Sequence, residues 1–273
     1  MELRDKVAVI TGAGSGIGRS LATAFADEGA RAVVCTDLDG DNAAETAVMV
    51  NEAHPGVATS AALDVGDERA VEQVVVDTTE ATGSLDVFVS NAGYGLRGGL
   101  DLPTDEWQKM MNVHTWSHLY AARAVIPGMV ERGGGYLLNT ASAAGLLTQM
   151  DSGPYAVSKH AAVAFAEWVL INHGDEGIGV SVLCPQAVRT NILGPRALDK
   201  PTNAPLNDAA RQAAGDGILE PDDVARDCVE AMREERFLVL PHPEVSTYFE
   251  RKANDYDRWL RGMRRFRQRL VGG

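Results

Sequence analysis

The chain has 273 residues, with 25 basic and 38 acidic side chains and a formal net charge of −13. This acidic balance argues against nucleic acid and against anionic membrane as partners. The chain has no apolar run of about 20 residues and no signal-peptide pattern at its start, so we expect neither a transmembrane helix nor export. The cysteines Cys35, Cys184 and Cys228 form no disulfide or metal-binding pattern, which favours a cytoplasmic location.

The first informative segment reads as strand, glycine-rich turn and helix. Val7–Thr11 is a short apolar, β-branched run that predicts a buried parallel strand, and Gly12–Gly18 follows it at once. In this context Gly12 allows a tight turn, Gly16 lets the backbone approach a pyrophosphate, and Gly18 lets the helix pack on the strand. A flexible linker is the alternative, but apolar segments on both sides disfavour it. The segment therefore predicts a dinucleotide-binding loop.

A carboxylate ends the second predicted strand, Ala32–Asp37, about 20 residues beyond this loop. At that place Asp37 can accept hydrogen bonds from both ribose hydroxyls of an adenosine and would repel a 2′-phosphate. Neither Ser15 nor Leu38 supplies a cation for such a phosphate, so the sequence favours NAD over NADP. The alternative is that Asp37 caps the next predicted helix, Asp39–Asn51.

The remaining segments alternate between patterns typical of strands and patterns typical of helices. Further strands are expected at 57–63, 87–90, 136–139, 180–184 and 237–240, and helices at 68–81, from Thr104, at 155–172 and from Glu220. This alternation predicts an α/β fold, a three-layer Rossmann-type doubly wound parallel sheet of about seven strands. We expect one dinucleotide-binding and catalytic domain over residues 1–245, with a substrate lid at 191–217.

Polar residues follow several of these strands. Asp64 either accepts a hydrogen bond from an adenine amino group or caps the helix at 68–81. Asn91 begins an Asn-Ala-Gly run at the carboxyl end of the fourth strand, where ligands bind in open α/β sheets. Asn112 lies inside a predicted helix, which is mildly unfavourable, so it either faces solvent or holds a water inside the core.

The segment 246–273 differs from the acidic body because it is rich in arginine. Its apolar residues recur at spacings of three and four, which predicts one long amphipathic helix with a basic outer face. This C-terminal extension either packs on its own subunit or reaches an acidic neighbouring subunit.

Tyr155 and Lys159 stand four residues apart, so a helix would place both side chains on one face. An ammonium group beside a phenol favours the phenolate, and we expect it to lower the pKa of Tyr155. Such a tyrosine could exchange a proton near neutral pH. The alternative is an ordinary Tyr/Lys pair on an exposed helix face.

Over about residues 5–240 the chain resembles the short-chain dehydrogenase/reductase family, in its compact single-domain branch. The motifs that carry the resemblance occur in family order: Thr11–Gly18, Asn91–Gly93, Asn112, Ser142, Tyr155-x-x-x-Lys159 and Pro185–Thr190. Ser142 precedes Tyr155 by thirteen residues, as in that family. Two positions depart from the pattern: Ser90 replaces an asparagine, and Gln186 replaces the glycine usual after the proline.

The resemblance implies an NAD-dependent oxidoreductase that interconverts a secondary alcohol and a ketone without a metal. It gives Tyr155 the role of general acid/base. It assigns Lys159 to lowering the pKa of that tyrosine and to holding the nicotinamide ribose. Ser142 would orient the substrate oxygen, and Asn112 would anchor a water that relays the proton.

The resemblance also implies a cofactor site and a substrate pocket. The cofactor residues are Gly12, Ser15, Gly16, Ile17, Gly18, Asp37, Leu38, Asp64, Val65, Asn91, Ala92, Gly93, Tyr155, Lys159, Pro185, Val188 and Thr190. The expected pocket residues are Tyr94, Leu96, Ala144, Leu147, Met150, Gln186 and Ile192. Their mostly apolar character favours a hydrophobic alcohol or ketone, while Arg97 leaves a carboxylated substrate open.

Other functions remain as alternatives. A 3-oxoacyl reductase (of carrier-protein or CoA substrates) usually draws on NADPH, which Asp37 disfavours. A non-catalytic dinucleotide-sensing or scaffold protein would be expected to have lost one of the four catalytic residues. An epimerase or dehydratase would be expected to have another glycine spacing and a longer substrate domain. By resemblance we expect a small-molecule substrate and a homo-oligomer, either a dimer or a tetramer.

Overall fold

The computed structural model describes residues 1–193 and 214–271, so most of the predicted lid at 191–217 lies outside the described residues. The strands are β1 (Val7–Thr11), β2 (Ala32–Asp37), β3 (Ala58–Ala62), β4 (Val87–Ser90), β5 (Gly135–Thr140), β6 (Ile178–Leu183) and β7 (Leu238–Val239). The first helices are α1 (Gly16–Asp27), α2 (Gly40–Ala53), α3 (Glu68–Thr82), α4 (Thr104–Met111), the π turn η1 (Asn112–Trp116) and α5 (Ser117–Glu131). The later ones are α6 (Ala144–Leu147), α7 (Gly153–His173), η2 (Gly174–Glu176), η3 (Asn191–Leu193), η5 (Ala214–Asp216), α9 (Pro221–Arg233), α10 (Glu244–Asn254) and α11 (Tyr256–Val271).

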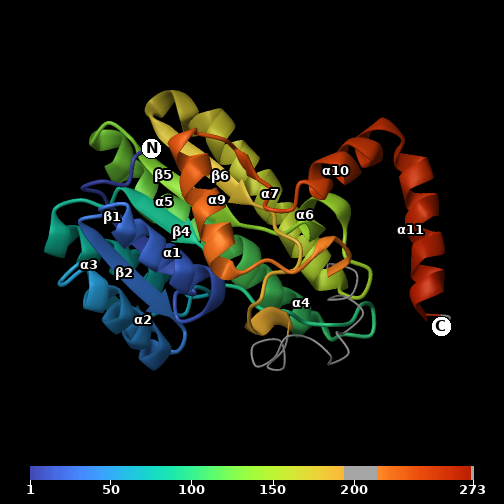
Figure 1. Cartoon of the computed structure of the whole chain (residues 1–273), viewed down its shortest axis with the longest axis horizontal. Coiled ribbons are helices and arrows are strands. Elements are labelled where there is room, and N and C mark those ends of the chain that lie inside the picture. Colours follow the sequence, from blue (N-terminus) through green and yellow to red (C-terminus); the bar gives the residue numbers. More distant parts are fainter. Residues whose placement is uncertain (194–213, 272–273) are drawn as a thin grey trace.

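The described strands form one parallel sheet in the order β3-β2-β1-β4-β5-β6-β7. The chain reverses direction across the sheet between β1 and β4, and ligands bind at such a point in open α/β sheets. One core packs α1 and α9 against one face, and a second core packs α3, α5 and α7 against the other. Figure 1 shows α1 and α9 side by side across the front of the sheet. The predicted three-layer Rossmann-type fold is confirmed.

The apolar runs became strands because both faces of this sheet are covered. All residues of β1, β4 and β5 are buried, which a parallel sheet between two helix layers requires. The carboxyl ends of these three strands lie together at one edge of the sheet, since all of them run in the same direction. The residues that follow them therefore form the site.

The starts of α4 and α3 are set by different residues. Helix α4 begins at Thr104, and Pro103 precedes it as its N-cap residue. The N-cap of α3 is Asp67, whose Oδ1 accepts hydrogen bonds from the backbone N–H groups of Arg69 and Ala70. Asp64 thus does not cap α3, because it stands too far before the first helical turn.

The predicted single tail helix is also wrong, since it is two helices joined at Asp255. This residue has an extended backbone, with φ −151° and ψ 86°. Its Oδ1 accepts a hydrogen bond of 2.9 Å from the N–H of Arg258, so Asp255 ends α10 and caps α11. Val245 on α10 is fully buried in the core, and α10 therefore spans the expected domain boundary at 245. Figure 1 shows α11 at the right, joined to the body through α10.

Candidate active site

The glycine-rich turn packs against the ends of two strands. Gly12 has φ +64°, and a side chain there would bring a Cβ to 2.8 Å from the Ala92 Cα. A Cβ on Gly18 would stand 2.2 Å from the Gly12 carbonyl oxygen, so only glycine lets α1 approach this closely. Ser15 is the extended N-cap of α1, but its hydroxyl does not cap the helix. The first N–H groups of α1 are thus left for an anion.

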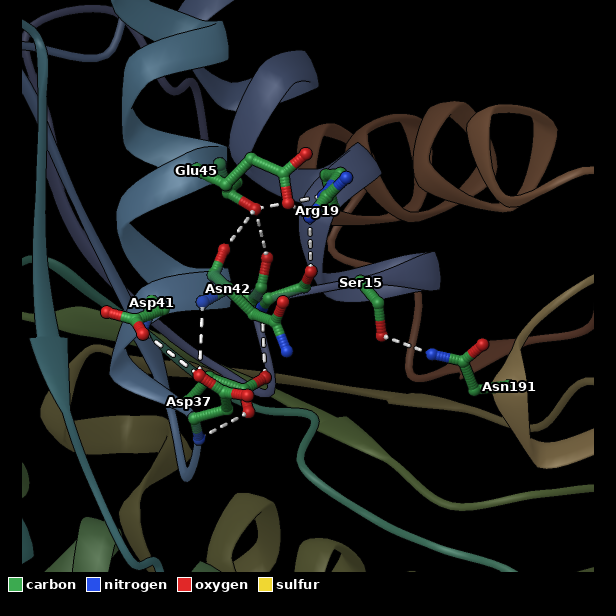
Figure 2. A network of polar contacts seen from close by, with 11 residues as sticks. Ser15, Arg19, Asp37, Asp41, Asn42, Glu45 and Asn191 are labelled. Atoms are coloured by element: carbon green, nitrogen blue, oxygen red, sulfur yellow. Dashed lines mark hydrogen bonds and ion pairs between the residues drawn. The ribbon is translucent and has the colours of Figure 1, made fainter. Parts of the chain in front are cut away.

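Asp37 lies against this turn and not on the next helix. Its Oδ2 accepts a hydrogen bond of 2.9 Å from the Gly14 N–H, and its Oδ1 accepts one of 3.1 Å from the Asp39 N–H. The cap of α2 is Asp39, which accepts from Asp41 and Asn42, so the capping alternative for Asp37 is wrong. Figure 2 shows Asp37 and Asp41 close together at this end of the site. The surface here is acidic.

Arg19 is the base in the same network, and its charge is already engaged. Its guanidinium donates to the Gly14 carbonyl at 2.5 Å and to the Thr46 hydroxyl at 3.0 Å, and it pairs with Glu45 at 3.1 Å (Figure 2). Leu38 is exposed, and the Ser15 hydroxyl accepts a hydrogen bond of 3.4 Å from the Asn191 amide. None of these side chains offers an uncommitted cation for a 2′-phosphate.

Asn91 ties the ends of three strands together. Its Nδ2 donates to the Thr11 carbonyl at 3.0 Å, and its Oδ1 accepts from the Thr140 hydroxyl at 3.1 Å. Asp64 is exposed and accepts only from the nearby Gly66 N–H, while Val65 is buried. The strand ends are therefore fixed in place before any ligand binds.

The segment Pro185–Thr190 connects the two halves of the site. The Pro185 carbonyl accepts hydrogen bonds from the Ala143 N–H at 2.9 Å and from the Ser142 hydroxyl at 3.4 Å. At its other end, the Thr190 methyl would lie 2.8 Å from a Cβ on Gly16. Val188, within this segment, is buried, and Ile17 of α1 packs against the core.

Ser142, Tyr155 and Lys159 come together where β5 ends and α7 begins. The Lys159 Nζ donates a hydrogen bond of 2.8 Å to the Thr140 carbonyl oxygen and lies 5.8 Å from the centre of the Tyr155 ring. Gly93 lies beside this cluster, since a Cβ there would stand 3.1 Å from the His114 Nε2 and 3.7 Å from the Lys159 Nζ. The spacing on one helix face is thus confirmed.

The pKa values of this cluster differ from the expectation. Burial raises the pKa of Tyr155, although a hydrogen bond with Ser142 lowers it in part. Burial also lowers the pKa of Lys159 to about 7. The expected lowering of the tyrosine pKa is wrong for the protein alone, because desolvation of both groups opposes their charged forms.

Asn112 and His114 both lie on the π turn η1, and of the two it is His114 that reaches the site. The Asn112 Oδ1 accepts a hydrogen bond of 2.9 Å from Gln108, and this side chain is half-buried. From the same π turn, the fully buried His114 ring reaches the site and stacks edge-on to Tyr155 at 5.4 Å. Sequence reasoning missed His114. A π turn adds a residue to the helical repeat and so changes which side chains face the core.

The pocket beside Ser142 and Tyr155 has a volume of about 820 Å³. Of the expected pocket residues, its lining includes Leu96, Ala144, Leu147, Gln186 and Ile192. Tyr94 and Met150 lie outside that lining: Tyr94 packs on His114 at 5.4 Å, and Met150 is half-buried nearby.

The C-terminal helices form a wall of this pocket that sequence reasoning missed. Tyr248 and Arg251 of α10 and Trp259, Met263 and Phe266 of α11 all line it. Trp259, Met263 and Phe266 are spaced by four and three, so they share one face of α11. That spacing was the available signal, but periodicity identifies an apolar face without saying what it covers.

Two further features, a metal-binding cluster and a membrane-spanning helix, are absent from the side chains and helices of the described ranges. In the ranges 1–193 and 214–271, no group of three or more His, Cys, Asp or Glu side chains is placed to hold a metal ion. Among the helices in the same ranges, none has the length and apolar character needed to cross a bilayer.

A dinucleotide-binding sheet with a Ser-Tyr-Lys cluster beside an apolar pocket defines a nicotinamide-dependent oxidoreductase. The family model described as "short chain dehydrogenase" matches residues 6–201. The chain therefore belongs to the short-chain dehydrogenase/reductase family, whose members interconvert alcohols and ketones with NAD(P).

Similar proteins agree with this membership. The 1-deoxy-11-beta-hydroxypentalenate dehydrogenase of Streptomyces avermitilis is 33% identical over 264 residues, which cover 95% of this chain and 93% of the relative. A short-chain dehydrogenase/reductase from Burkholderia phymatum, solved in complex with NAD, is 30% identical, with a TM-score of 0.83 and coverage of 94% and 96% of the two chains. Levodione reductase is 27% identical, with a TM-score of 0.78 and coverage of 87% and 96%.

Proposed function

We propose that this protein is an NAD-dependent oxidoreductase that interconverts a hydrophobic secondary alcohol and its ketone, with Tyr155 as general acid/base. The observation that carries the proposal is the position of one cluster. Ser142 and Tyr155 line the pocket of about 820 Å³, and Lys159 stands behind them on the side of Gly93. Substrate and cofactor would meet at these side chains.

The residues at the sheet edge fit a nicotinamide dinucleotide. The uncapped start of α1 and the close-packed glycine turn suit a pyrophosphate, and Asp37 suits the adenosine ribose. Asp39 and Asp41 add negative charge beside Asp37, which supports NAD over NADP. When bound, the nicotinamide would supply or accept the hydride.

The chain's own residues would move the proton. In reduction the Tyr155 phenol donates its proton to the ketone oxygen, and in oxidation its phenolate accepts the alcohol proton. The Ser142 hydroxyl donates a hydrogen bond to the same substrate oxygen and orients it. Lys159, held on the Thr140 carbonyl, stabilises the phenolate when it is charged.

The role expected for Asn112 stays a prediction. Its side-chain oxygen accepts a hydrogen bond from the Gln108 Nε2 at 2.9 Å. Lys159 has the Thr140 carbonyl as its hydrogen-bond acceptor and can use its other N–H groups for a cofactor or a water.

The lining of the pocket supports a hydrophobic substrate. Leu96, Leu147 and Ile192 line one part of it, and the aromatic rings of Trp259 and Phe266 line another. Apolar and aromatic walls with a few polar groups are typical of small-molecule sites. Two relatives from Streptomyces species, 33% and 34% identical, are named as dehydrogenases of a hydroxylated compound, which agrees with alcohol oxidation.

Replacement of the tyrosine tests this function. We expect Tyr155→Phe to lower kcat at least about 100-fold on a panel of cyclic secondary alcohols, while NADH still binds with wild-type affinity by fluorescence titration. Tyr120→Phe, which removes a phenol on α5 away from the pocket, serves as the matched control. Turnover by Tyr155→Phe within a few-fold of that control would refute the assignment.

We also propose a homo-oligomer in a reducing cytoplasm. Trp168 and Ile171 of α7 are 55% and 81% exposed, which supports contact with a second copy. The cysteines are buried free thiols, as a reducing compartment allows. Light scattering of the purified protein would test the assembly, and a monomer at micromolar concentration would contradict it.

A further inference from the structure

The pocket is lined mostly by apolar side chains, with some uncharged polar groups and a few charged ones. Its charged lining residues are Arg97, Asp151, Asp216 and Arg251. A charge in an apolar pocket needs a partner, from the protein or from a ligand.

Three of the four charges have a partner within the protein, although the Asp151 Oδ2 has an ion-pair partner and no hydrogen bond. The Arg97 Nε lies 3.6 Å from an Asp151 carboxylate oxygen, so these two charges offset each other. Both oxygens of Asp216 accept hydrogen bonds, from the Gln186 Nε2 at 2.7 Å and from the Tyr248 hydroxyl at 3.0 Å. A substrate anion at Arg97 would also face the carboxylate of Asp151.

Arg251 differs from the other three. Within residues 1–193 and 214–271, no carboxylate lies within ion-pair distance of its guanidinium. Its side chain is exposed and lines the pocket together with Tyr248 of its own helix and with Trp259, Met263 and Phe266 of α11.

The backbone that carries Arg251 is fixed. The next residue, Lys252, is buried and its Nζ donates a hydrogen bond of 2.6 Å to the Leu146 carbonyl. Val245, two turns earlier, is fully buried in the core. The guanidinium therefore extends from an anchored helix, on a different wall of the pocket from Ser142 and Tyr155.

We propose that Arg251 binds a carboxylate carried by the substrate. The pocket then takes an apolar, ring-containing secondary alcohol, or the matching ketone, with an acid group remote from the reacting carbon. A guanidinium binds a carboxylate through two parallel hydrogen bonds, which fixes the orientation of the molecule as well as holding it. This substrate class rests on the proposed oxidoreductase function and adds a second point of recognition to it.

The test uses probes that differ only in this charge. Lithocholate and its methyl ester are both ring-containing secondary alcohols, and we measure KM and kcat for each with NAD. The wild type should favour the acid. In Arg251→Gln the ratio of kcat/KM for acid to that for ester should fall about 10-fold, chiefly through KM, because the guanidinium is partly exposed to water.

Two further variants make the result specific. Arg258→Gln removes an exposed charge from α11 that does not line the pocket, and it should leave the ratio unchanged. Arg251→Lys keeps the charge but loses the planar fork, so it should retain part of the preference. A wild-type ratio near one, or an equal fall for acid and ester in Arg251→Gln, would overturn the carboxylate site.

The failure of this inference can be told apart from failure of the proposed function. If the wild type oxidises the ester with NAD but does not favour the acid, the function stands and the carboxylate site falls. If neither probe is turned over, calorimetry with 3-ketocholanate and NADH compares wild type with Arg251→Gln. Equal dissociation constants, or no binding to either protein, would then refute the site.

Discussion

The backbone N–H of Tyr94 donates a hydrogen bond of 3.0 Å to the Nε2 of His114. Because Nε2 is the acceptor, the ring proton is on Nδ1, which lies 3.1 Å from the Ser158 hydroxyl. Burial lowers the pKa of His114 well below its usual value, so the ring is neutral. This histidine thus joins the loop after β4 to α7, one residue from Lys159.

His114→Leu should therefore disturb both stability and catalysis. It leaves the Tyr94 N–H and the Ser158 hydroxyl without their partner, and we expect the free energy of unfolding to fall by about 2–3 kcal/mol. Because the same ring positions Tyr155, kcat should fall more than KM changes. Urea unfolding and steady-state kinetics would measure the two effects, and His114→Gln should recover part of the loss.

His118 is the matched control for this prediction. It stands one helical turn further on and is buried, but neither of its ring nitrogens has a hydrogen-bond partner in the described part of the chain. Replacing an unsatisfied polar ring by an apolar side chain is often neutral or stabilising, so His118→Leu should cost less than about 1 kcal/mol. A larger loss for His118→Leu than for His114→Leu would contradict this account.

His118 should also make the stability of the fold sensitive to acid. Burial lowers the pKa of His118 to about 3, against about 6.5 in an unfolded chain. Between these values the unfolded state binds more protons, so stability falls as the pH falls, by up to about 1.4 kcal/mol per pH unit. From pH 6.5 to pH 4.5 the unfolding free energy of the wild type should therefore fall by more than that of His118→Leu. A constant difference would show that His118 does not carry this effect.

Asp37→Asn tests the cofactor preference. The amide retains an oxygen to accept from the backbone but removes the charge that would repel a 2′-phosphate. We expect the ratio of kcat/KM for NADP to that for NAD to rise at least about 10-fold. Asp41→Asn, which removes an exposed charge nearby, should change this ratio less. A wild type that prefers NADP would contradict the role of Asp37.

Much of the fold and site could be predicted because the signals are local. The apolar run Val7–Thr11, the glycine turn and the spacing of Ser142, Tyr155 and Lys159 each lie within a short stretch of chain. A parallel sheet then brings the strand ends to one edge, so the order of the motifs already implies that they meet.

The features that were missed depend on tertiary contacts or on small backbone choices. The π turn at Asn112–Trp116 turns His114 inward, and no propensity signals one extra residue in a helical turn. Asp255 ends α10 because its carboxylate caps α11, a choice that the amphipathic periodicity does not reveal. The pKa of Tyr155 depends on the burial of the assembled site, which the spacing of the Tyr/Lys pair does not contain.

Deleting residues 256–273 tests the pocket wall. Trp259, Met263 and Phe266 would be lost from the lining, so the KM for a hydrophobic ring alcohol should rise at least about 10-fold. The affinity for NADH should stay unchanged, because the glycine turn and Asp37 lie far from α11 in the fold. An unchanged KM would show that the wall does not bind substrate. A smaller number of subunits per particle by light scattering would show that α11 also contacts a neighbouring subunit.

Two point variants distinguish the contribution of the pocket-lining side chains of α11 from that of the helix as a whole. Phe266→Ala removes a ring that lines the pocket, whereas Leu260→Ala changes a side chain that is 47% exposed and outside the lining. We expect Phe266→Ala to raise the KM several-fold and Leu260→Ala to leave it as in the wild type. Equal effects of the two variants on the KM would indicate that α11 affects the KM through its general structure and not through contact of Phe266 with the substrate.

The extended residue Asp255 separates two kinds of evolutionary constraint. Most changes before it act on the sheet or on the proton-transfer cluster and lower both stability and turnover, although Tyr248 and Arg251 of α10 also line the pocket. Changes after it act on α11, and the helix that α11 chiefly contacts is α10. The final helix can therefore diverge in sequence, or be exchanged between relatives, to alter which alcohols are accepted while the hydride and proton chemistry is retained.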